Sequence, residues 1–341
     1  MKLLFTGKTD FKYNRVRILI AGLRKLPGIE LTVYPIQSRK SFDTQEFKRL
    51  AEEADFIYIP PFRHRDVSFI KSLTSKPIVF DPLISKMLTK DDFGQFWKRP
   101  FKYFLDKVPF AKCDILLSDT ECHKQYFSRV FSIPLAKIQV LRIGVDSDAF
   151  YPMEAKAESE VFTVGFYGGF VPLQGTDKIM EAAKLLKGDS SIRFVLIGDG
   201  YRFEQAKALA EKYKLNNVEF KGVLPYEALN EAMRDFDLAL GIFGDSAKAD
   251  YVIPNKIYHY ASTGKCILSK DTPGIRELFS NGKNIALCDS DPESIAESIR
   301  ALKANPKKRA QLGQAAAELI NGKYNEVEIA KQFLAILKAY Q

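Results

Sequence analysis

Short apolar runs alternate with longer amphipathic stretches along the whole chain. The short runs are rich in β-branched and aromatic residues, and some, such as Phe194–Gly198 (FVLIG), are apolar throughout. Strands separated by helical patterns of about ten to fifteen residues are typical of βαβ units, and fully apolar strands are typical of parallel sheets covered on both faces. The predicted strands are Lys2–Thr6, Leu31–Ile36, Asp55–Ile59, Pro77–Phe80, Asp114–Ser118, Ile138–Arg142, Val161–Tyr167, Arg193–Ile197, Val218–Lys221, Leu238–Ile242, Cys266–Ser269 and Ile285–Cys288.

A polar segment divides this pattern into two halves. Residues 148–160 (DAFYPMEAKAESE) contain a proline and no strand pattern, so we predict a linker here. A chain of 341 residues is long enough for two domains of ordinary size. We therefore predict an α/β protein with one domain over residues 1–150 and a second over 151–324. Apolar residues at helical spacing predict a terminal helix over residues 325–341, whose apolar stripe must pack on another element.

Composition and cysteine usage narrow the cellular setting. No apolar run reaches the length of about eighteen residues that a membrane-spanning helix needs. The N-terminal sequence turns polar after its first few residues, whereas a secretory signal needs about seven or more apolar residues in a row. The four cysteines are widely spaced, which favours reduced thiols over a metal site. We expect a cytoplasmic protein.

The net charge of +9 comes entirely from the first half. Residues 1–152 hold 26 Lys and Arg against 17 Asp and Glu, whereas residues 153–341 hold 25 of each. A one-sided basic field favours an anionic partner, such as a phospholipid surface, a phosphorylated acceptor or nucleic acid. A solvated basic surface without a partner is the alternative.

Loops at three predicted strand ends of the second half are suited to a ligand. Gly169 follows the strand Val161–Tyr167 in a glycine loop that opens a helix, whose free N–H groups can hold an anion. Gly198 ends the next strand, and the backbone of Val223 and Leu224 could meet a flat base after the third. A tight turn with no ligand is the alternative at each place.

A long polar loop follows the predicted strand Leu238–Ile242, and long loops in compact domains are often functional. Lys248 and Lys256 could reach a phosphate there, with Asn255 as an added donor. His259 lies four residues after Asn255, on the same helical face. The alternatives are lysines that face solvent and a histidine in the core or on the surface.

The turn Asp271–Gly274 is expected to open a further helix that holds Glu277. A carboxylate at that place could accept hydrogen bonds from hydroxyl groups. It could also merely favour the helix dipole.

Taken in order, four stretches of the second half resemble glycosyltransferase family 4, the retaining, nucleotide-sugar-dependent enzymes of the GT-B fold. The resemblance implies a GT-B architecture, in which two Rossmann-like domains have parallel sheets that face each other across a cleft. It implies a nucleotide-sugar donor bound by the second domain, an acceptor bound by the first and a terminal helix that joins the first. It also implies no metal and no covalent cofactor. The matching stretches are residues 165–186, 194–200, 218–229 and 254–278.

The chain departs from the family pattern at the donor phosphates and at the sugar. Phe170 and Gln174 occupy positions where many relatives carry an Arg and a Lys that grip the diphosphate. His259 maps to the second of two glutamates, and the first maps to about Tyr251. The resemblance then implies that Lys248 and Lys256 hold the diphosphate, that His259 binds a ribose hydroxyl and that Asp250 binds the sugar.

The resemblance also suggests candidates in the first domain, where a glycine loop of relatives faces the donor phosphates. Asp81 follows the strand Pro77–Phe80, where relatives often place a polar residue near the reacting sugar; an N-cap or turn aspartate is the alternative. The predicted catalytic residues are Asp81, Lys248 and Lys256. The predicted donor-binding residues are Gly7, Lys8, Arg15, Gly169, Gln174, Gly198, Val223, Leu224, Asp250, Asn255, His259 and Glu277.

Residues 93–112 (FGQFWKRPFKYFLDKVPFAK) interleave aromatic and basic side chains. This composition suits a membrane interface, so we predict docking on an anionic membrane and a peripheral position on its inner face. An amphipathic helix packed on the sheet is the alternative.

The predicted function is transfer of a sugar, with retention of configuration, to a glycan or lipid-linked acceptor in cell-surface polysaccharide or glycolipid synthesis. A non-catalytic nucleotide-sugar-binding protein is the alternative. An inverting GT-B enzyme would need a base such as Asp81. We expect no nucleic-acid partner, because the aromatics cluster in one segment and no recognition motif is present.

Overall fold

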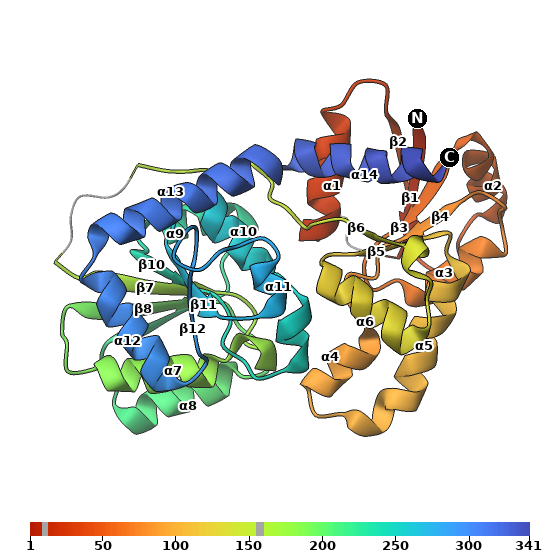
Figure 1. The fold of residues 1–341 in the computed structure, drawn as a ribbon. Coiled ribbons are helices and arrows are strands. Elements are labelled where there is room, and N and C mark those ends of the chain that lie inside the picture. The colour runs from red at the N-terminus through yellow and green to blue at the C-terminus, as the bar shows by residue number, and fades with distance from the viewer. Residues whose placement is uncertain (9–12, 155–159) are drawn as a thin grey trace. The chain divides into compact units, whose positions relative to one another are not determined.

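The computed structural model describes residues 1–8, 13–154 and 160–341, so residues 155–159 of the predicted linker lie outside the described residues. The chain forms two compact units (Figure 1). The first comprises Met1–Asp146 and Tyr324–Gln341, and the second comprises Ser147–Lys323. Each unit contains a six-stranded parallel sheet.

The sheet of the first unit has the strand order β2-β1-β3-β4-β5-β6. Every residue of the inner strands β3 and β5 is buried, as expected of a parallel sheet covered on both faces. The strands are β1 (Lys2–Gly7), β2 (Glu30–Pro35), β3 (Phe56–Ile59), β4 (Ile78–Phe80), β5 (Ile115–Ser118) and β6 (Ile138–Val140). The helices are α1 (Asn14–Arg24), α2 (Thr44–Glu53), α3 (His64–Lys71), α4 (Lys86–Asp92), η1 (Phe96–Lys98), α5 (Arg99–Lys112), α6 (Glu121–Phe131), η2 (Leu135–Lys137) and α14 (Glu326–Tyr340).

The sheet of the second unit has the order β12-β11-β10-β7-β8-β9. Numbered within the unit, this is the 3-2-1-4-5-6 order of a doubly wound dinucleotide-binding fold, and its strand order reverses between β7 and β10. The strands are β7 (Phe162–Tyr167), β8 (Ile192–Ile197), β9 (Val218–Gly222), β10 (Leu238–Leu240), β11 (Ile267–Lys270) and β12 (Ala286–Cys288). The helices are η3 (Pro172–Gln174), α7 (Thr176–Leu186), α8 (Phe203–Tyr213), η4 (Tyr226–Ala228), α9 (Leu229–Arg234), η5 (Ala247–Tyr251), α10 (Asn255–Ser262), α11 (Pro273–Arg276), α12 (Pro292–Lys303) and α13 (Pro306–Lys323).

The terminal helix α14 belongs to the first unit and packs on α1. Its apolar residues Ile329, Phe333 and Leu337 are fully buried. The two helices approach closely at Gly22, where an added Cβ would collide with the carbonyl oxygen of Glu326. Lys25 Nζ also lies 2.7 Å from Glu326 Oε1. Figure 1 shows α14 alongside α1, far from it in sequence.

The α/β class and all twelve predicted strands are confirmed, with bounds that differ by one or two residues. One prediction about helices is wrong. Thr272 caps the helix α11, which ends at Arg276, so Glu277 lies at the carboxyl end of a single turn. A carboxylate there gains nothing from the helix dipole, which favours anions only at the amino end. No helix among the described residues is long and apolar enough to cross a membrane.

Candidate functional site

The carboxyl ends of β7 and β10 meet at the point where the strand order of the second unit reverses. Open α/β sheets bind ligands in the crevice at such a point. The loops after β7 and β8 are pressed together there: a Cβ at Gly198 would overlap the carbonyl oxygen of Gly168. The predicted residues Gly169 and Gly198 therefore lie at the same place, on neighbouring strand ends.

Lys256 is a buried cation at this switch point. It lies in the first turn of α10, is 3% exposed, and donates from Nζ to the carbonyl oxygen of Gly241, just after β10, at 3.2 Å. The ammonium lies 3.5 Å from the ring centroid of Phe166, a cation–π contact. A Cβ at Gly168 would lie 3.2 Å from the same nitrogen. Burial lowers the pKa of Lys256 well below its usual value.

His259 is buried one turn later on the same helix. Its ring stacks on Phe150 at 3.8 Å between centroids, and its Nδ1 contacts the Tyr167 hydroxyl. Its Nε2 is buried without a hydrogen-bond partner among the described residues. Burial lowers the pKa of His259 to about 3, so the ring is neutral at physiological pH. A neutral imidazole nitrogen can bond a hydroxyl group.

Sequence reasoning missed the aromatic partners of His259, of which Tyr167 and Phe150 stack on its ring and Tyr226 contacts it edge-on. Tyr167 ends β7, and Phe150 lies in the connection between the two sheets. The only signal was that Tyr167 sits at the end of a strand next to the glycine loop. The contact of Phe150 with α10 could not be predicted from the sequence, because it joins residues that are far apart along the chain.

The loop after β7 differs chemically from that of many relatives. Phe170 is fully buried and packs edge-on against Phe166 and Phe203, so this position contributes to the core. Gln174 is 8% exposed, and its Oε1 is buried without a hydrogen-bond partner among the described residues. The neighbouring helix α7 begins at Thr176, and its N-cap is Gly175, whose φ of 65° lies in the left-handed region.

The remaining predicted residues of the second unit lie in the segments that follow β9, β10 and β11. Lys248 and Asp250 are half-buried in η5, which packs against α11 near Gly274. Asn255 begins α10, one residue before Lys256. Val223 is 72% exposed after β9, and Leu224 is half-buried. Glu277 is half-buried after α11.

A cluster of polar side chains around Asp245, which the sequence analysis did not predict, holds the loop after β10 in place. Lys178 Nζ lies 2.5 Å from Asp245 Oδ2, and Lys270 Nζ lies 3.6 Å from Asp245 Oδ1. Ser290 Oγ donates to the same carboxylate at 3.1 Å. The hydrogen bond from Lys178 lowers the pKa of Asp245. This cluster ties the loop to α7 and to the end of β11.

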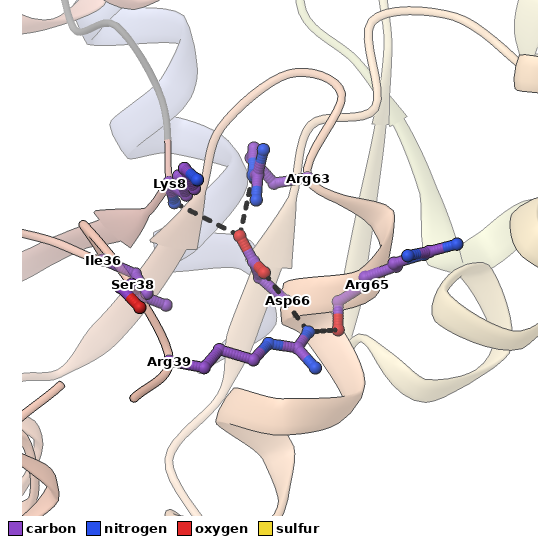
Figure 2. A pocket seen from close by; sticks show the side chains of 7 residues that line it. All are labelled: Lys8, Ile36, Ser38, Arg39, Arg63, Arg65 and Asp66. Atoms are coloured by element: carbon purple, nitrogen blue, oxygen red, sulfur yellow. Dashed lines mark hydrogen bonds and ion pairs between the residues drawn. The ribbon is translucent and has the colours of Figure 1, made fainter. Parts of the chain in front are cut away.

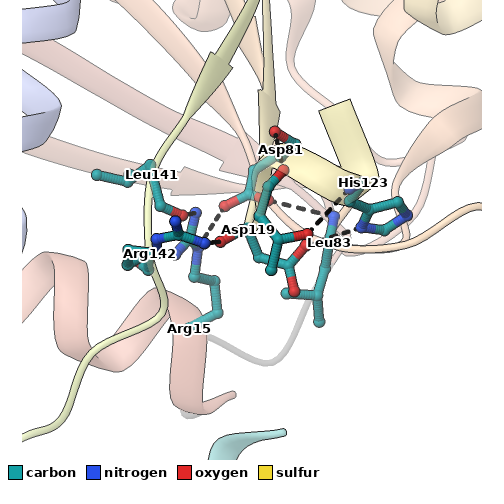
Figure 3. Close-up of polar contacts among 9 residues, drawn as sticks. Arg15, Asp81, Leu83, Asp119, His123, Leu141 and Arg142 are labelled. Atoms are coloured by element: carbon teal, nitrogen blue, oxygen red, sulfur yellow. Dashed lines mark hydrogen bonds and ion pairs between the residues drawn. The ribbon is translucent and has the colours of Figure 1, made fainter. Parts of the chain in front are cut away.

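In the first unit, the predicted residues Arg15 and Asp81 form a buried ion pair (Figure 3). Arg15 Nε donates to Asp81 Oδ2 at 2.7 Å, and both side chains are 1% exposed. Arg15 also donates to the carbonyl oxygens of Leu141, at 2.8 Å, and of Arg142. These bonds connect the start of α1, the end of β4 and the segment after β6.

Asp81 is also the turn aspartate that we gave as the alternative. Its Oδ1 accepts from the backbone N–H of Leu83 at 3.2 Å, the side-chain bond of an Asx turn. Its Oδ2 accepts a further hydrogen bond from the Tyr58 hydroxyl at 3.0 Å. Internal partners therefore account for both carboxylate oxygens.

Gly7 ends β1, and Lys8, the next residue, lines a pocket of the first unit (Figure 2). The Lys8 N–H donates to Asp66 Oδ2 at 3.2 Å. The carboxylate of Asp66 also accepts from Arg63 Nε at 2.7 Å. Among the described residues, no group of three or more His, Cys, Asp and Glu side chains could hold a metal ion.

Comparison with known proteins identifies relatives. Residues 152–319 match the family model described as glycosyl transferases group 1. The chain is 24% identical over 254 residues to an uncharacterized glycosyltransferase, MJ1069, of Methanocaldococcus jannaschii, which covers 71% of this chain and 64% of that protein. It is 25% identical over 211 residues to WcaL of Escherichia coli, a putative colanic acid biosynthesis glycosyltransferase, which covers 60% of this chain and 52% of that protein. These matches thus span less than two thirds of the relatives' own length.

Solved structures show the same fold. The crystal structure of Anabaena Alr3699/HepE in complex with UDP superposes with a TM-score of 0.77, at 15% identity, over 99% of this chain and 100% of that one. The two parallel sheets and this likeness establish two Rossmann-like domains of the GT-B kind. Over residues 152–319 the chain is similar to glycosyl transferases group 1, and its listed relatives carry the name glycosyltransferase.

Proposed function

We propose that this protein is a retaining glycosyltransferase that moves a sugar from a nucleoside-diphosphate sugar to a glycan or lipid-linked acceptor. The observation that carries the proposal is the buried cation of Lys256 at the β7/β10 switch point. Support also comes from relatives in colanic acid biosynthesis and in phosphatidylinositol N-acetylglucosaminyl transfer. A structural neighbour binds UDP-glucose. We place the reaction in cell-surface polysaccharide or glycolipid synthesis.

On this proposal, the diphosphate of the donor sits over the switch point. Lys256 and Lys248 neutralise the charge that develops on the leaving phosphate, and N–H groups at the start of α7 add to this. Gln174 offers its amide near the same helix start. These groups replace the Arg and Lys that many relatives carry after β7.

The nucleoside lies beside the neighbouring loops. The free Nε2 of His259 bonds a hydroxyl of the donor, because a buried imidazole that is neutral can either donate or accept. Val223 and Leu224 offer backbone groups to the base, and Asp250 and Glu277 offer carboxylates to the sugar hydroxyls. Gly169 and Gly198 let the backbone approach the ligand.

Retention of configuration requires the acceptor to attack from the face that the leaving group occupies. As the bond between the anomeric carbon and the phosphate oxygen breaks, the phosphate oxygen takes the proton of the acceptor hydroxyl. The acceptor oxygen then forms its bond to the anomeric carbon on the same face. Lys256 stabilises the phosphate through both events. Asp81 and Arg15 stabilise the first unit as a pair, and Asp81 acts on the sugar only through the geometry it maintains.

The segment from η1 through α5 is the proposed membrane contact. The buried side of α5 is formed by Asp106, Pro109 and Phe110, while its other side exposes apolar groups to solvent. Three of the exposed aromatic rings lie against the charged group of a basic side chain: Phe96 against Arg99, Trp97 against Lys98 and Phe101 against Lys102. Such a surface fits the headgroup region of an anionic bilayer. The exposed apolar side chains are Phe96, Trp97, Phe101, Phe104 and Val108.

The test is turnover of UDP-, GDP- and ADP-sugars, read as donor hydrolysis or transfer, with NMR of the product's anomeric centre. We expect turnover of one donor class, retention of configuration and no effect of a metal chelator. Replacing both Lys248 and Lys256 by Met should lower turnover at least about a hundredfold. Lys187→Met, at the exposed carboxyl end of α7, is the matched control. Donor binding without any turnover would identify a non-catalytic protein instead.

A further inference from the structure

The first unit has a pocket in which Lys8 is the one lining residue that was predicted to bind the donor. It has a volume of about 320 Å³ and lies at the carboxyl ends of β1 and β2 and the start of α3 (Figure 2). The strand order 2-1-3-4-5 of this sheet reverses between β1 and β3, so the pocket lies at a second switch point. Its lining residues are Lys8, Ile36, Ser38, Arg39, Arg63, Arg65 and Asp66.

The lining is strongly cationic. Four basic residues line the pocket together with one acidic residue, Asp66, which is 2% exposed. Asp66 accepts from Arg63 Nε at 2.7 Å and from Arg39 Nη2 at 3.4 Å. The buried carboxylate therefore fixes two guanidinium groups at the pocket wall.

Two further basic residues of the pocket make no ion pair within the part of the chain that the structure describes. The guanidinium of Arg65 and the ammonium of Lys8 have no ion-pair partner among the described residues. Figure 2 shows Asp66 between Lys8, Arg63 and Arg39. With four basic residues against one acidic residue, the lining of the pocket carries a formal net charge of +3.

Elementary chemistry selects the ligand. Planar guanidinium groups present paired N–H donors that match the oxygens of phosphate, and several arranged around one cavity favour a group with more than one negative charge. The eight-residue helix α3 directs its amino end at the same place, which adds a partial positive charge. The volume, at the small end of the range for ligand sites, admits a phosphorylated sugar or polyol.

We propose that this pocket binds a phosphoryl group. If the proposed function is right and the first unit binds the acceptor, the inference deepens it: the acceptor carries a phosphate next to the hydroxyl that receives the sugar. The phosphate could belong to a soluble sugar phosphate or to a lipid headgroup, and the recognition chemistry is the same for both.

The experiment is calorimetric titration of the full chain with inorganic phosphate and with glycerol phosphate, followed by competition with vesicles of phosphatidic acid in phosphatidylcholine. We expect binding of glycerol phosphate that weakens at least about tenfold in the double variant Arg39→Gln/Arg65→Gln, because two charged donors are lost. Arg24→Gln, which removes an exposed charge elsewhere in the same unit, should bind as the unaltered protein does.

Two arms separate the sources of the phosphate. A lipid headgroup is indicated if vesicles with phosphatidic acid displace glycerol phosphate and vesicles of phosphatidylcholine alone do not. A soluble ligand is indicated if neither vesicle competes. Equal affinities in the double variant and the control, or no binding of either phosphate compound, would overturn the proposal.

Measuring donor binding in the same variants distinguishes a failure of the phosphoryl-site proposal from a failure of the proposed function. The double variant should bind nucleoside-diphosphate sugars as the unaltered protein does, since neither Arg39 nor Arg65 is among the predicted donor-binding residues. If the protein binds glycerol phosphate but no nucleotide sugar, the pocket is a phosphoryl site, and the proposal that it binds the acceptor of a sugar transfer is wrong.

Discussion

At the scale of single residues, the burial of Lys256 predicts a pH-dependent affinity. Burial lowers the pKa of its ammonium, and a bound diphosphate would raise that pKa again by favouring the charged form. Nucleotide binding should therefore take up a proton at pH values between the pKa of the empty protein and that of the complex. Affinity should be highest below the first value and fall as pH rises towards the second, about tenfold for each unit between them.

Calorimetry in two buffers of different ionisation enthalpy measures this proton uptake directly. Lys256→Met should abolish the uptake as well as weaken binding. His259 should not contribute, because its pKa of about 3 keeps it neutral throughout the range. Proton uptake that persists unchanged in Lys256→Met would show that another group is responsible.

Gly168 predicts a second effect on the same cation. Its φ of 152° lies in a region that favours glycine, and a Cβ there would lie 3.2 Å from both Cε and Nζ of Lys256. Gly168→Ala should therefore shift the ammonium and weaken nucleotide-sugar binding about tenfold, at a cost in stability of about 1 kcal/mol. Titration and thermal unfolding measure the two effects.

The matched control is Gly188→Ala, since no atom lies within 4 Å of the added Cβ. This variant should bind normally and be as stable as the unaltered protein or slightly more so. Equal binding by both alanine variants would mean that Lys256 does not contact the donor.

At the scale of elements, α5 and η1 predict membrane association. Replacing Trp97, Phe101 and Phe104 by Ser should lower binding to anionic vesicles at least about tenfold, because these side chains are 73%, 57% and 62% exposed and available to lipid. Folding stability should change little, as is usual for exposed positions. Vesicle sedimentation and thermal unfolding measure the two quantities. Leu135→Ser, 43% exposed on the same unit, is the control, and equal sedimentation of the two variants would remove this contact.

The α1–α14 contact predicts a stability effect at the same scale. An added Cβ at Gly22 would collide with the Glu326 backbone and lie 2.9 Å from the Cβ of Ala330. Gly22→Ala should destabilise the protein by about 1–3 kcal/mol through overpacking, seen as a lower melting temperature. Gly322→Ala, in the helix α13 with open space around its Cβ, should not. An unchanged melting temperature of Gly22→Ala would show that the two helices do not pack this closely.

The strands could be predicted from the sequence, whereas the contacts between side chains of different elements could not. Short runs of β-branched and aromatic residues, such as that of β8, mark the strands locally in the sequence, so all twelve strands could be located. The pairing of Arg15 with Asp81 joins residues 66 positions apart, and the stacking of His259 on Phe150 depends on tertiary packing. Glu277 was misplaced because the capping signal of Thr272 marks where a helix begins and does not show that it ends after one turn.

At the scale of the whole molecule, charge divides along the two units. The first unit holds 28 Lys and Arg against 18 Asp and Glu, and the second holds 23 against 24. The excess of basic residues in the first unit fits an anionic acceptor or membrane as its partner. In the second unit, the side chain of Lys256 is buried at the β7/β10 switch point, where we propose that the diphosphate binds.

The central claim is that this buried point binds the donor, and direct titration with UDP-, GDP- and ADP-sugars tests it. The account predicts that at least one of them binds and that Lys256→Met weakens its binding at least about tenfold, while Lys187→Met does not. Absence of binding to all three, or equal affinity of Lys256→Met and the unaltered protein, would contradict the account.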